Sequence, residues 1–286
     1  IRLYSTGETG VTMNGCTDSI IKNSEIFDIV RGGVYINGGE VLTLTPGNSG
    51  AENCHIYDFA DENTYMAGVT LEGMGNFAKN NTIHDSMSQG VYIIGNGHHV
   101  ENNEVYDVVR DTYDAGAIYG IVAKENIGNK ILNNYIHDIK KSYRNWGKIH
   151  GIYMDNMSSG VEFSNNIISD CISGGLYGGG RNNIINNNIF LDCKIEYDNR
   201  GVFGGWFRVN NAHWDLPITS EEGYDAELWY NTYPYWRDIV ESTAKEKAWF
   251  DDPSNNPKYD AGIPRDSVIE NNITIQLERD FDSDYF

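Results

Sequence analysis

The sequence predicts an all-β solenoid, because one short phrase recurs along most of its 286 residues. The phrase consists of two asparagines, an apolar residue two positions after the second of them, and a closing aspartate. The closing aspartates follow one another at intervals of 22 to 32 residues, which indicates a repeat with a base period of about 22 residues and occasional insertions. The clear copies are Asn80–Asp85, Asn102–Asp107, Asn133–Asp138, Asn165–Asp170 and Asn187–Asp192, with weaker copies that end at Asp28 and Asp58 and a last one that begins at Asn271.

Each unit also contains short apolar runs of strand length, separated by Gly, Asn and Asp. A sheet cannot close within so short a unit, so each strand must pair with the equivalent strand of the next unit. The result is a set of parallel sheets that run along a cylinder. The runs include Val34–Ile36, Val69–Leu71, Val91–Ile93 and Ile152–Met154.

Two positions of the phrase predict how the cylinder is filled and closed. The residue two places before each closing aspartate is apolar, which predicts an inward-facing stack of Ile26, Ile56, Ile83, Val105, Ile136, Ile168 and Phe190. The residue four places before it is mostly asparagine, whose stacked side chains can hydrogen-bond along a ladder and hold a sharp turn. This second row reads Ser24, Cys54, Asn81, Asn103, Asn134, Asn166 and Asn188, with Asn272 in the last copy.

One domain over residues 1–286 is expected, because the core of a solenoid grows by stacking. Residues 209–265 break the repeat and carry helix-like stretches around 226–229 and 236–240, so we expect a partly helical insertion there. Its many aromatic side chains are expected to pack it onto the cylinder, with sugar stacking as the alternative. The first residues read like the middle of a domain, which predicts a fragment of a longer chain with further segments or domains outside it.

Composition narrows the classes of partner. The formal net charge of −20 disfavours nucleic acid, and it disfavours polyanionic sugars such as pectate unless calcium bridges the charges. Neutral oligo- or polysaccharides meet no such objection. No apolar run is long enough to span a membrane, and no cysteine or histidine spacing is typical of a metal site. We therefore expect no membrane span, no metal and no cofactor. A structural calcium ion is the one exception that the sequence allows.

The cysteines predict one close pair. Cys171 and Cys193 each follow a repeat aspartate and are 22 positions apart, so they should be neighbours on adjacent coils, about 4.8 Å apart. That separation allows a disulfide. Two stacked buried thiols are the favoured interpretation, since cysteine behaves as a small apolar residue.

Chemistry is expected where the regular rows are interrupted. The repeat aspartates are too regular to be catalytic and are interpreted as turn residues. Extra residues follow two of them, at 111–119 and 142–150, and they put Asp114 and Asp155 in successive coils. The two carboxylates could face one cleft, flanked by the aromatic side chains of Tyr113, Tyr119 and Trp146.

A carboxylate pair of this kind is what glycosidic bond cleavage needs. One carboxyl must be protonated to deliver a proton to the leaving oxygen, and the other must stay ionised to attack the sugar or activate water. Separations of about 5–5.5 Å predict retention of configuration, and about 6.5–9.5 Å predict inversion. From the residues alone, loop-structuring aspartates remain the alternative.

Four further residues are candidates for binding substrate. His150 could bond a sugar hydroxyl or tune Asp155, or it could simply pack a loop. Arg181 and Arg200 could grip hydroxyl groups, or they could satisfy nearby carbonyls and acids. Trp206 could form the floor beneath a sugar ring. Glu72 lies some three coils from Asp155, about 14 Å away, which places it in an outer subsite.

The paired motifs Asp114–Tyr119 and His150–Asp155 resemble those of glycoside hydrolase family 141, whose members are right-handed parallel β-helix enzymes of the pectate-lyase type. The resemblance to such β-helices covers about residues 15–205 and 265–278 and also includes the runs 178–183 and 198–201. It implies a right-handed helix, catalytic roles for Asp114 and Asp155, and an α-L-fucosidase or xylanase activity. In one departure from the expected pattern, Asn156 follows the second aspartate.

The favoured interpretation is therefore a glycosidase that degrades a neutral glycan or polysaccharide. Its expected location is extracellular, periplasmic or on the cell surface of a bacterial-type cell. One alternative is a polysaccharide lyase or uronate epimerase, which would require a basic groove. The other is a non-catalytic glycan-binding solenoid.

Overall fold

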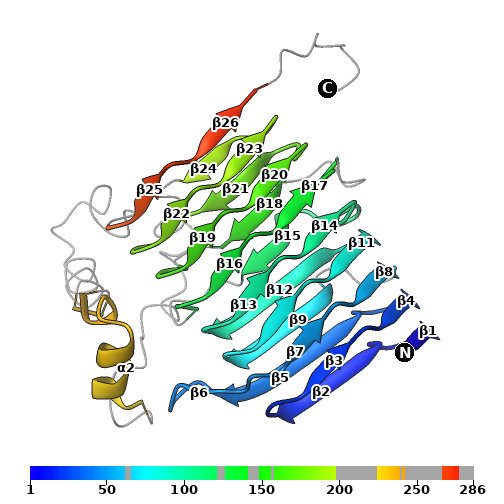
Figure 1. Cartoon of the computed structure of the whole chain (residues 1–286), viewed down its shortest axis with the longest axis horizontal. Coiled ribbons are helices and arrows are strands. Elements are labelled where there is room, and N and C mark those ends of the chain that lie inside the picture. The colour runs from blue at the N-terminus through cyan, green and yellow to red at the C-terminus, as the bar shows by residue number, and fades with distance from the viewer. Residues whose placement is uncertain are drawn as a thin grey trace, which may run out of the picture.

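The computed structural model describes residues 1–61, 66–120, 126–140, 148–155, 158–197, 224–238, 240–241 and 266–276. In these residues three long sheets run side by side along a cylinder (Figure 1). Each strand pairs in parallel with its equivalent one coil later, so the predicted parallel β-helix is confirmed. Sheet A consists of β1 (Arg2–Thr6), β4 (Glu25–Ile29), β8 (His55–Phe59), β11 (Thr82–Ser86), β14 (Glu104–Tyr106), β17 (Tyr135–His137), β20 (Ile167–Ser169), β23 (Ile189–Leu191) and β26 (Ile273–Ile275).

The other two sheets complete each coil. Sheet B contains β2 (Val11–Cys16), β5 (Val34–Glu40), β9 (Ala67–Met74), β12 (Gln89–Asn96), β15 (Ala115–Gly120), β18 (Ile149–Met154), β21 (Gly174–Gly178) and β24 (Ile195–Tyr197), and the short β6 (Thr45–Pro46) pairs antiparallel with β5. Sheet C contains β3 (Ile20–Lys22), β7 (Gly50–Glu52), β10 (Phe77–Lys79), β13 (His99–Glu101), β16 (Lys130–Leu132), β19 (Glu162–Ser164), β22 (Ile184–Asn186) and β25 (Val268–Glu270).

The interior is filled by apolar side chains in register. The predicted row on sheet A, from Ile26 to Phe190, is 0–1% exposed throughout. Alternate residues of a strand point to the same side, so sheet B also turns an apolar row inward. The two rows belong to one hydrophobic core. The row from sheet B consists of Val34, Val69, Val91, Ile118, Ile152 and Leu176.

The two asparagines of the repeated phrase have different tasks. The first has left-handed backbone, with φ between 56° and 61° in the five clear copies, a conformation that asparagine tolerates better than most residues. The second forms the predicted ladder: Asn103 Nδ2 donates to Asn134 Oδ1 at 3.0 Å, and Asn134 repeats the bond to Asn166. The closing aspartates also have φ between 47° and 55°, which fits their interpretation as turn residues.

The cysteine pair lies inside the cylinder. Cys171 and Cys193 are both free thiols on adjacent coils. The Cys171 thiol donates to the Ser169 carbonyl at 3.4 Å, and the Cys193 thiol donates to the Ile168 carbonyl at 3.3 Å. Burial raises the pKa of the Cys171 thiol. The expected stack of two buried thiols is therefore present.

The predicted helical insertion contains α2 (Ala226–Thr232), which begins after Asp225, whose side chain accepts a hydrogen bond from the Leu228 amide. Trp229 and Trp236 are 1% and 2% exposed. Tyr233 packs against Gly128 (φ 71°), where a Cβ would lie 2.5 Å from the Tyr233 ring, so glycine is needed there for the close approach. The insertion packs against the cylinder through a second, small hydrophobic core, to which the cylinder contributes Leu44, Met74 and Ile127.

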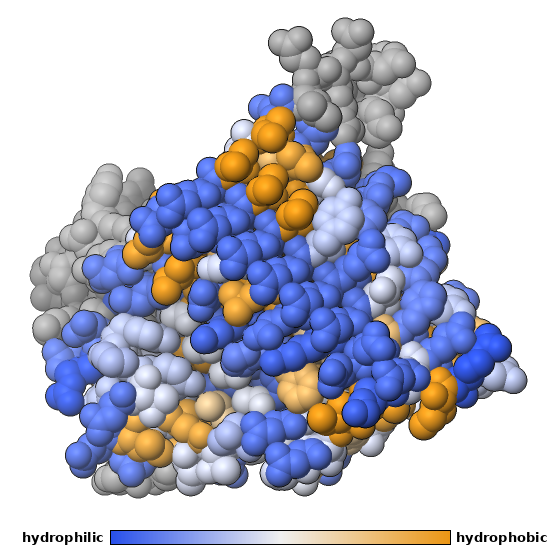
Figure 2. Space-filling model, in the orientation of Figure 1, coloured by the Kyte–Doolittle hydropathy of each residue, from blue (hydrophilic) through white to orange (hydrophobic). Residues whose placement is uncertain are grey.

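The surface differs along the length of the cylinder. Figure 2 shows mostly polar side chains on one face, with apolar side chains at the C-terminal coils and again along the N-terminal end. Among the described residues, no helix combines the length and apolarity needed to cross a lipid bilayer. The most exposed apolar residues at the C-terminal coils are Ile167, Ile172, Ile184, Val268, Ile269, Ile273 and Ile275.

Candidate functional site

The outer face of sheet B carries a row of tyrosines. Within each strand the residues beside the inward apolar row point outward, and in five of the coils this position is a tyrosine. Neighbouring rings of this row are tilted or edge-on, with centroids 4.7–5.5 Å apart between β12 and β21. We call it the tyrosine row: Tyr35, Tyr92, Tyr119, Tyr153 and Tyr177.

The two predicted catalytic aspartates are bound by this row in a reciprocal way. Asp155 follows β18 and accepts a hydrogen bond of 2.7 Å on Oδ2 from Tyr119 of β15. Asp114 precedes β15 and accepts a hydrogen bond of 3.0 Å on Oδ1 from Tyr153 of β18. Adjacent strands thus exchange phenol-to-carboxylate bonds, and Asp114 and Asp155 belong to one cluster.

Electrostatics couple both aspartates to both phenols. Burial, and then the charges of Asp155 and Asp114, raise the pKa of Tyr153 well above its ordinary value. Burial and Asp155 likewise raise the pKa of Tyr119, with a smaller contribution from Asp114. Both phenols therefore remain protonated donors at any ordinary pH.

The two aspartates differ in their exposure to solvent. Asp155 is 7% exposed, whereas Asp114 lies at the surface beside Tyr113, which is 39% exposed. Asp114 has a φ of 54°, which aspartate tolerates, in the loop that leads into β15. One carboxyl is thus held in the protein and the other is open to solvent.

His150 packs against two tyrosines of the row. Its ring is buried, stacks on Tyr177 at 4.9 Å and meets Tyr153 edge-on at 5.6 Å. In register, the positions on either side of it are Gly116 and Gly174, and the absence of a side chain at Gly174 leaves room for the imidazole ring. A Cβ at Gly174 would lie 3.1 Å from the His150 ring.

Two more charged side chains approach the tyrosine row. Glu72 accepts a 2.6 Å hydrogen bond from Tyr35, and three strand steps separate its strand β9 from β18. Burial, then Asp155 and Glu72, raise the pKa of Tyr92, so Tyr92 feels both carboxylates. At the other side, the Lys148 ammonium lies 5.5 Å from the centre of the Tyr177 ring.

Of the remaining predicted site residues, the structure describes Arg181. Arg181 is buried in the turn after β21, where its amide donates to Ser159 Oγ and its carbonyl accepts from Gly160. Trp146, Arg200 and Trp206 lie outside the described residues.

Sequence reasoning missed Tyr35, Tyr92 and Tyr177. The signal was available, because each follows an inward apolar residue in a short run such as Val91–Ile93. Period-two alternation would have predicted an outward tyrosine.

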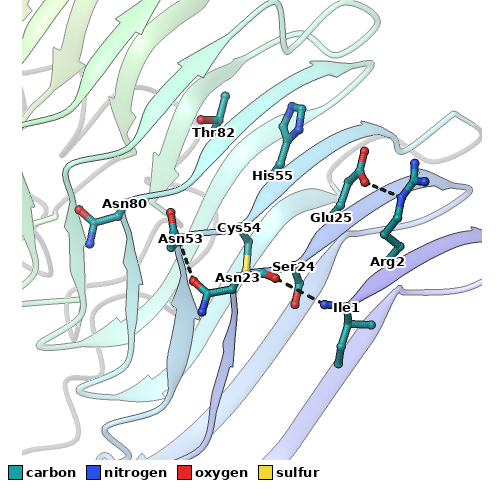
Figure 3. Close-up of a pocket in the computed structure, with 10 residues that line it drawn as sticks. All are labelled: Ile1, Arg2, Asn23, Ser24, Glu25, Asn53, Cys54, His55, Asn80 and Thr82. Atoms are coloured by element: carbon teal, nitrogen blue, oxygen red, sulfur yellow. Dashed lines mark hydrogen bonds and ion pairs between the residues drawn. The ribbon is translucent and has the colours of Figure 1, made fainter.

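A hollow of about 710 Å³ lies elsewhere on the molecule, where sheet C turns into sheet A (Figure 3). It is shallow, and its asparagines belong to the turns described above: Asn53 donates to Asn23 across neighbouring coils at 2.6 Å. Arg2 and Glu25 form an ion pair beside it, and His55 projects near its edge. None of its lining residues belongs to the aspartate cluster.

Comparison with known proteins shows the family of this chain and a distant relative. Residues 9–212 match the family model described as "right handed beta helix region". A cell surface glycoprotein of Methanothermus fervidus is 28% identical over 243 residues, which cover 80% of this chain and 39% of the relative. The chain therefore spans about two fifths of that relative's length. Among solved structures, the fluoroquinolone resistance protein QnrB1 aligns over 70% of this chain and 88% of its own, with 12% identity and a TM-score of 0.23, and we draw no argument from it.

Proposed function

This chain belongs to the right-handed β-helix family, and on that scaffold we propose that it is a glycoside hydrolase of neutral glycans. One observation carries the proposal. Asp114 and Asp155 come from adjacent coils, and each is fixed by a phenol that belongs to the other's strand. Such a pair provides the two carboxyl groups that cleavage of a glycosidic bond requires.

In the proposed reaction, one carboxyl group protonates the leaving oxygen as the other attacks the sugar carbon or activates a water molecule. Tyr119 donates a hydrogen bond to Asp155 Oδ2, and Tyr153 donates one to Asp114 Oδ1. These bonds orient each carboxylate before substrate binds. The raised pKa values of the two tyrosines keep them as donors throughout the reaction. They position the reacting groups and carry no proton to the substrate themselves.

The charges of the face support a neutral substrate. On the described part of the outer face of sheet B, the negative charges of Glu72, Asp114 and Asp155 outnumber the positive charge of Lys148. A polyuronate would therefore meet net electrostatic repulsion. Tyrosine rings and carboxylates are suited to the apolar faces and hydroxyl groups of neutral sugars. Fucosides and xylosides are the first substrates to test, in line with the resemblance to glycoside hydrolase family 141. The name of the relative supports a location at the cell surface or outside the cell.

The proposal is tested with Asp114→Asn and Asp155→Asn on aryl glycosides of fucose, xylose and galactose. Loss of a general acid or base costs about 10²–10⁴-fold in rate, so each variant should lose that much of kcat/KM. Asp192→Asn is the matched control, since Asp192 is a left-handed repeat aspartate outside the cluster. If both cluster variants cleave as fast as the control, neither aspartate is catalytic and the proposal fails.

A non-catalytic glycan-binding role is the second candidate. The same hydrogen bonds favour it, because a carboxylate engaged by a tyrosine from the next strand also serves as a cross-strand tie. Under this alternative, the chain binds glycans on an array and releases no sugar, and the two Asn variants bind as well as the unchanged protein. Absorbance of unsaturated uronates after incubation with pectate or alginate would instead indicate a lyase.

A further inference from the structure

Two histidines meet on the outer face of sheet A, a different sheet from the one that carries the tyrosine row. His55 lies on β8 and His84 on the neighbouring strand β11. Their Nε2 atoms are 2.6 Å apart, and the ring centroids are 4.9 Å apart. Two imidazole nitrogens therefore point at the same place on the protein surface.

His84 is held firmly in this orientation. Its Nδ1 atom is 2.7 Å from Asp85 Oδ2, and Arg110 binds the other oxygen of that carboxylate at 3.2 Å. Tyr57 and Tyr106 stack on His84 from the two adjacent strands, with interplanar angles of 4° and 8°. The carboxylate fixes which nitrogen carries the proton, so Nε2 of His84 presents a lone pair toward His55.

We propose that His55 and His84 bind a divalent transition metal ion, such as Zn²⁺, through their Nε2 atoms, with Asp85 as the outer carboxylate that orients His84. Neutral imidazole is the commonest protein ligand for such ions. A ligating histidine usually donates its other N–H to a carboxylate or carbonyl, which is the contact that His84 makes with Asp85.

The geometry needs a small adjustment that the surface permits. Two nitrogens bound to one tetrahedral zinc ion at about 2.0–2.1 Å lie roughly 3.3 Å apart, so the pair must open from 2.6 Å. His55 is the more exposed of the two and can turn, whereas His84 is clamped between aromatic rings. Figure 3 shows His55 beside the shallow hollow, which gives an ion and its water molecules access.

The surrounding charges are compatible with a cation. Glu25 faces His55 and is held by Arg2 at 2.6 Å and by the Tyr57 hydroxyl at 2.9 Å. Within the described residues no cluster of three or more His, Cys, Asp or Glu gathers as a closed metal site, so water molecules complete the coordination proposed here.

The test is calorimetric titration of the whole chain with zinc chloride at pH 7.5 in a buffer that does not chelate metal. We expect one zinc ion per chain, and at least about tenfold weaker binding in His55→Ala and in His84→Ala. Asp85→Asn should weaken binding by about 10–100-fold, the usual cost of losing a carboxylate partner of a metal-bound histidine.

His137→Ala is the matched control. His137 occupies the same row, stacks on Tyr106 at 4.8 Å and contacts Asp138 at 2.9 Å, but its other nitrogen faces Glu104 in place of an imidazole ring. Zinc binding should be unchanged in this variant. No binding by the unchanged chain at millimolar zinc, or equal binding by His55→Ala and the control, would overturn the proposal and leave a plain His–His hydrogen bond. Because His55 is exposed, its variant should fold even if His84→Ala does not.

Discussion

The outer faces of sheets A and B are both lined with aromatic rings, but the rings are arranged differently. On sheet A, six rings stack nearly parallel, with interplanar angles of 3–16°. On sheet B, neighbouring tyrosines are inclined by 41–87°, and their hydroxyl groups turn toward carboxylates. The stacked row of sheet A consists of Tyr4, Phe27, Tyr57, His84, Tyr106 and His137.

This difference distinguishes a row of rings that mainly stabilises its sheet from a row whose hydroxyl groups orient carboxylates. A parallel stack satisfies each ring with its neighbour and mainly stabilises the sheet. In the tyrosine row the rings give up that stacking, and their hydroxyl groups instead orient Asp114 and Asp155. The row whose hydroxyl groups hold carboxylates is therefore the place to look for catalysis.

The largest expected effect concerns the carboxylates of sheet B. If both act in cleavage, kcat/KM plotted against pH should be bell-shaped in the unchanged chain. Asp114→Asn and Asp155→Asn should each lower the maximum by about 10²–10⁴-fold and abolish a different limb of the bell. The limb lost with each variant identifies the acid and the base. If the same limb disappears in both, the two aspartates do not have distinct roles.

The next effect concerns stability and sheet A. Tyr57→Ala removes a ring that stacks between Phe27 and His84 at 5.0 Å and 5.2 Å. Two lost aromatic pairs should lower the free energy of unfolding by about 2 kcal/mol, as measured by urea denaturation. Glycan cleavage should stay unchanged. A loss of activity with intact folding would mean that the stacked row also takes part in function.

A smaller effect is expected for the phenols of the tyrosine row. Tyr153→Phe keeps the ring and removes the hydrogen bond to Asp114. A bond of that kind contributes about 1.4 kcal/mol, so kcat/KM should fall about tenfold. Tyr106→Phe on sheet A is the control and should leave kcat/KM as it is. Equal rates for the two variants would show that the phenol does not position Asp114 for catalysis.

The smallest effects concern the repeat aspartates. Burial and the nearby Asp61, Asp28 and Asp85 raise the folded-state pKa of Asp58, so its contribution to stability is present at low pH and is lost as pH rises through that value. Asp58→Asn should therefore stabilise the chain at pH 7, by up to about 0.5 kcal/mol, and have no benefit at pH 3.

Asp138 provides the opposite sign within the same row. Hydrogen bonds from Lys140 and His137 lower its folded-state pKa, so its contribution is present above the ordinary aspartate pKa and is lost as pH falls through the lowered value. Asp138→Asn should destabilise the chain at pH 7, again by up to about 0.5 kcal/mol. Thermal unfolding of both variants at pH 3 and pH 7 measures the contrast, and a shift in the same direction for both would contradict it.

The repeated phrase was sufficient to predict the fold, because its positions are defined by contacts between equivalent residues. Asn134 bonds to Asn103 and Asn166, and each of the three is recognisable from its place in the phrase. Asp114 and Asp155 are also found together, because each lies where the repeat is interrupted on adjacent coils. Their catalytic roles stay predictions, as do the roles of Trp146, Arg200 and Trp206.

Contacts between different positions of the phrase could not be predicted in this way. His55 stands three places before its closing aspartate and His84 one place before its own, so alignment of the repeats does not bring them together. They meet diagonally, because long side chains on neighbouring strands reach across the register. Orientation of a ring or a hydroxyl group depends on such diagonal neighbours.

The asparagine ladder has a consequence for how such a molecule can change. Asn81 and Asn103 are 22 residues apart and Asn103 and Asn134 are 31 apart, yet the two bonds have the same length of 3.0 Å. Each coil is closed by hydrogen bonds to the equivalent asparagine of the neighbouring coil. The length of the loop that connects two coils therefore has little effect on the cylinder. Insertions in the segments before β15 and β18 can therefore accumulate during evolution and change the recognition surface, while the cylinder keeps its structure.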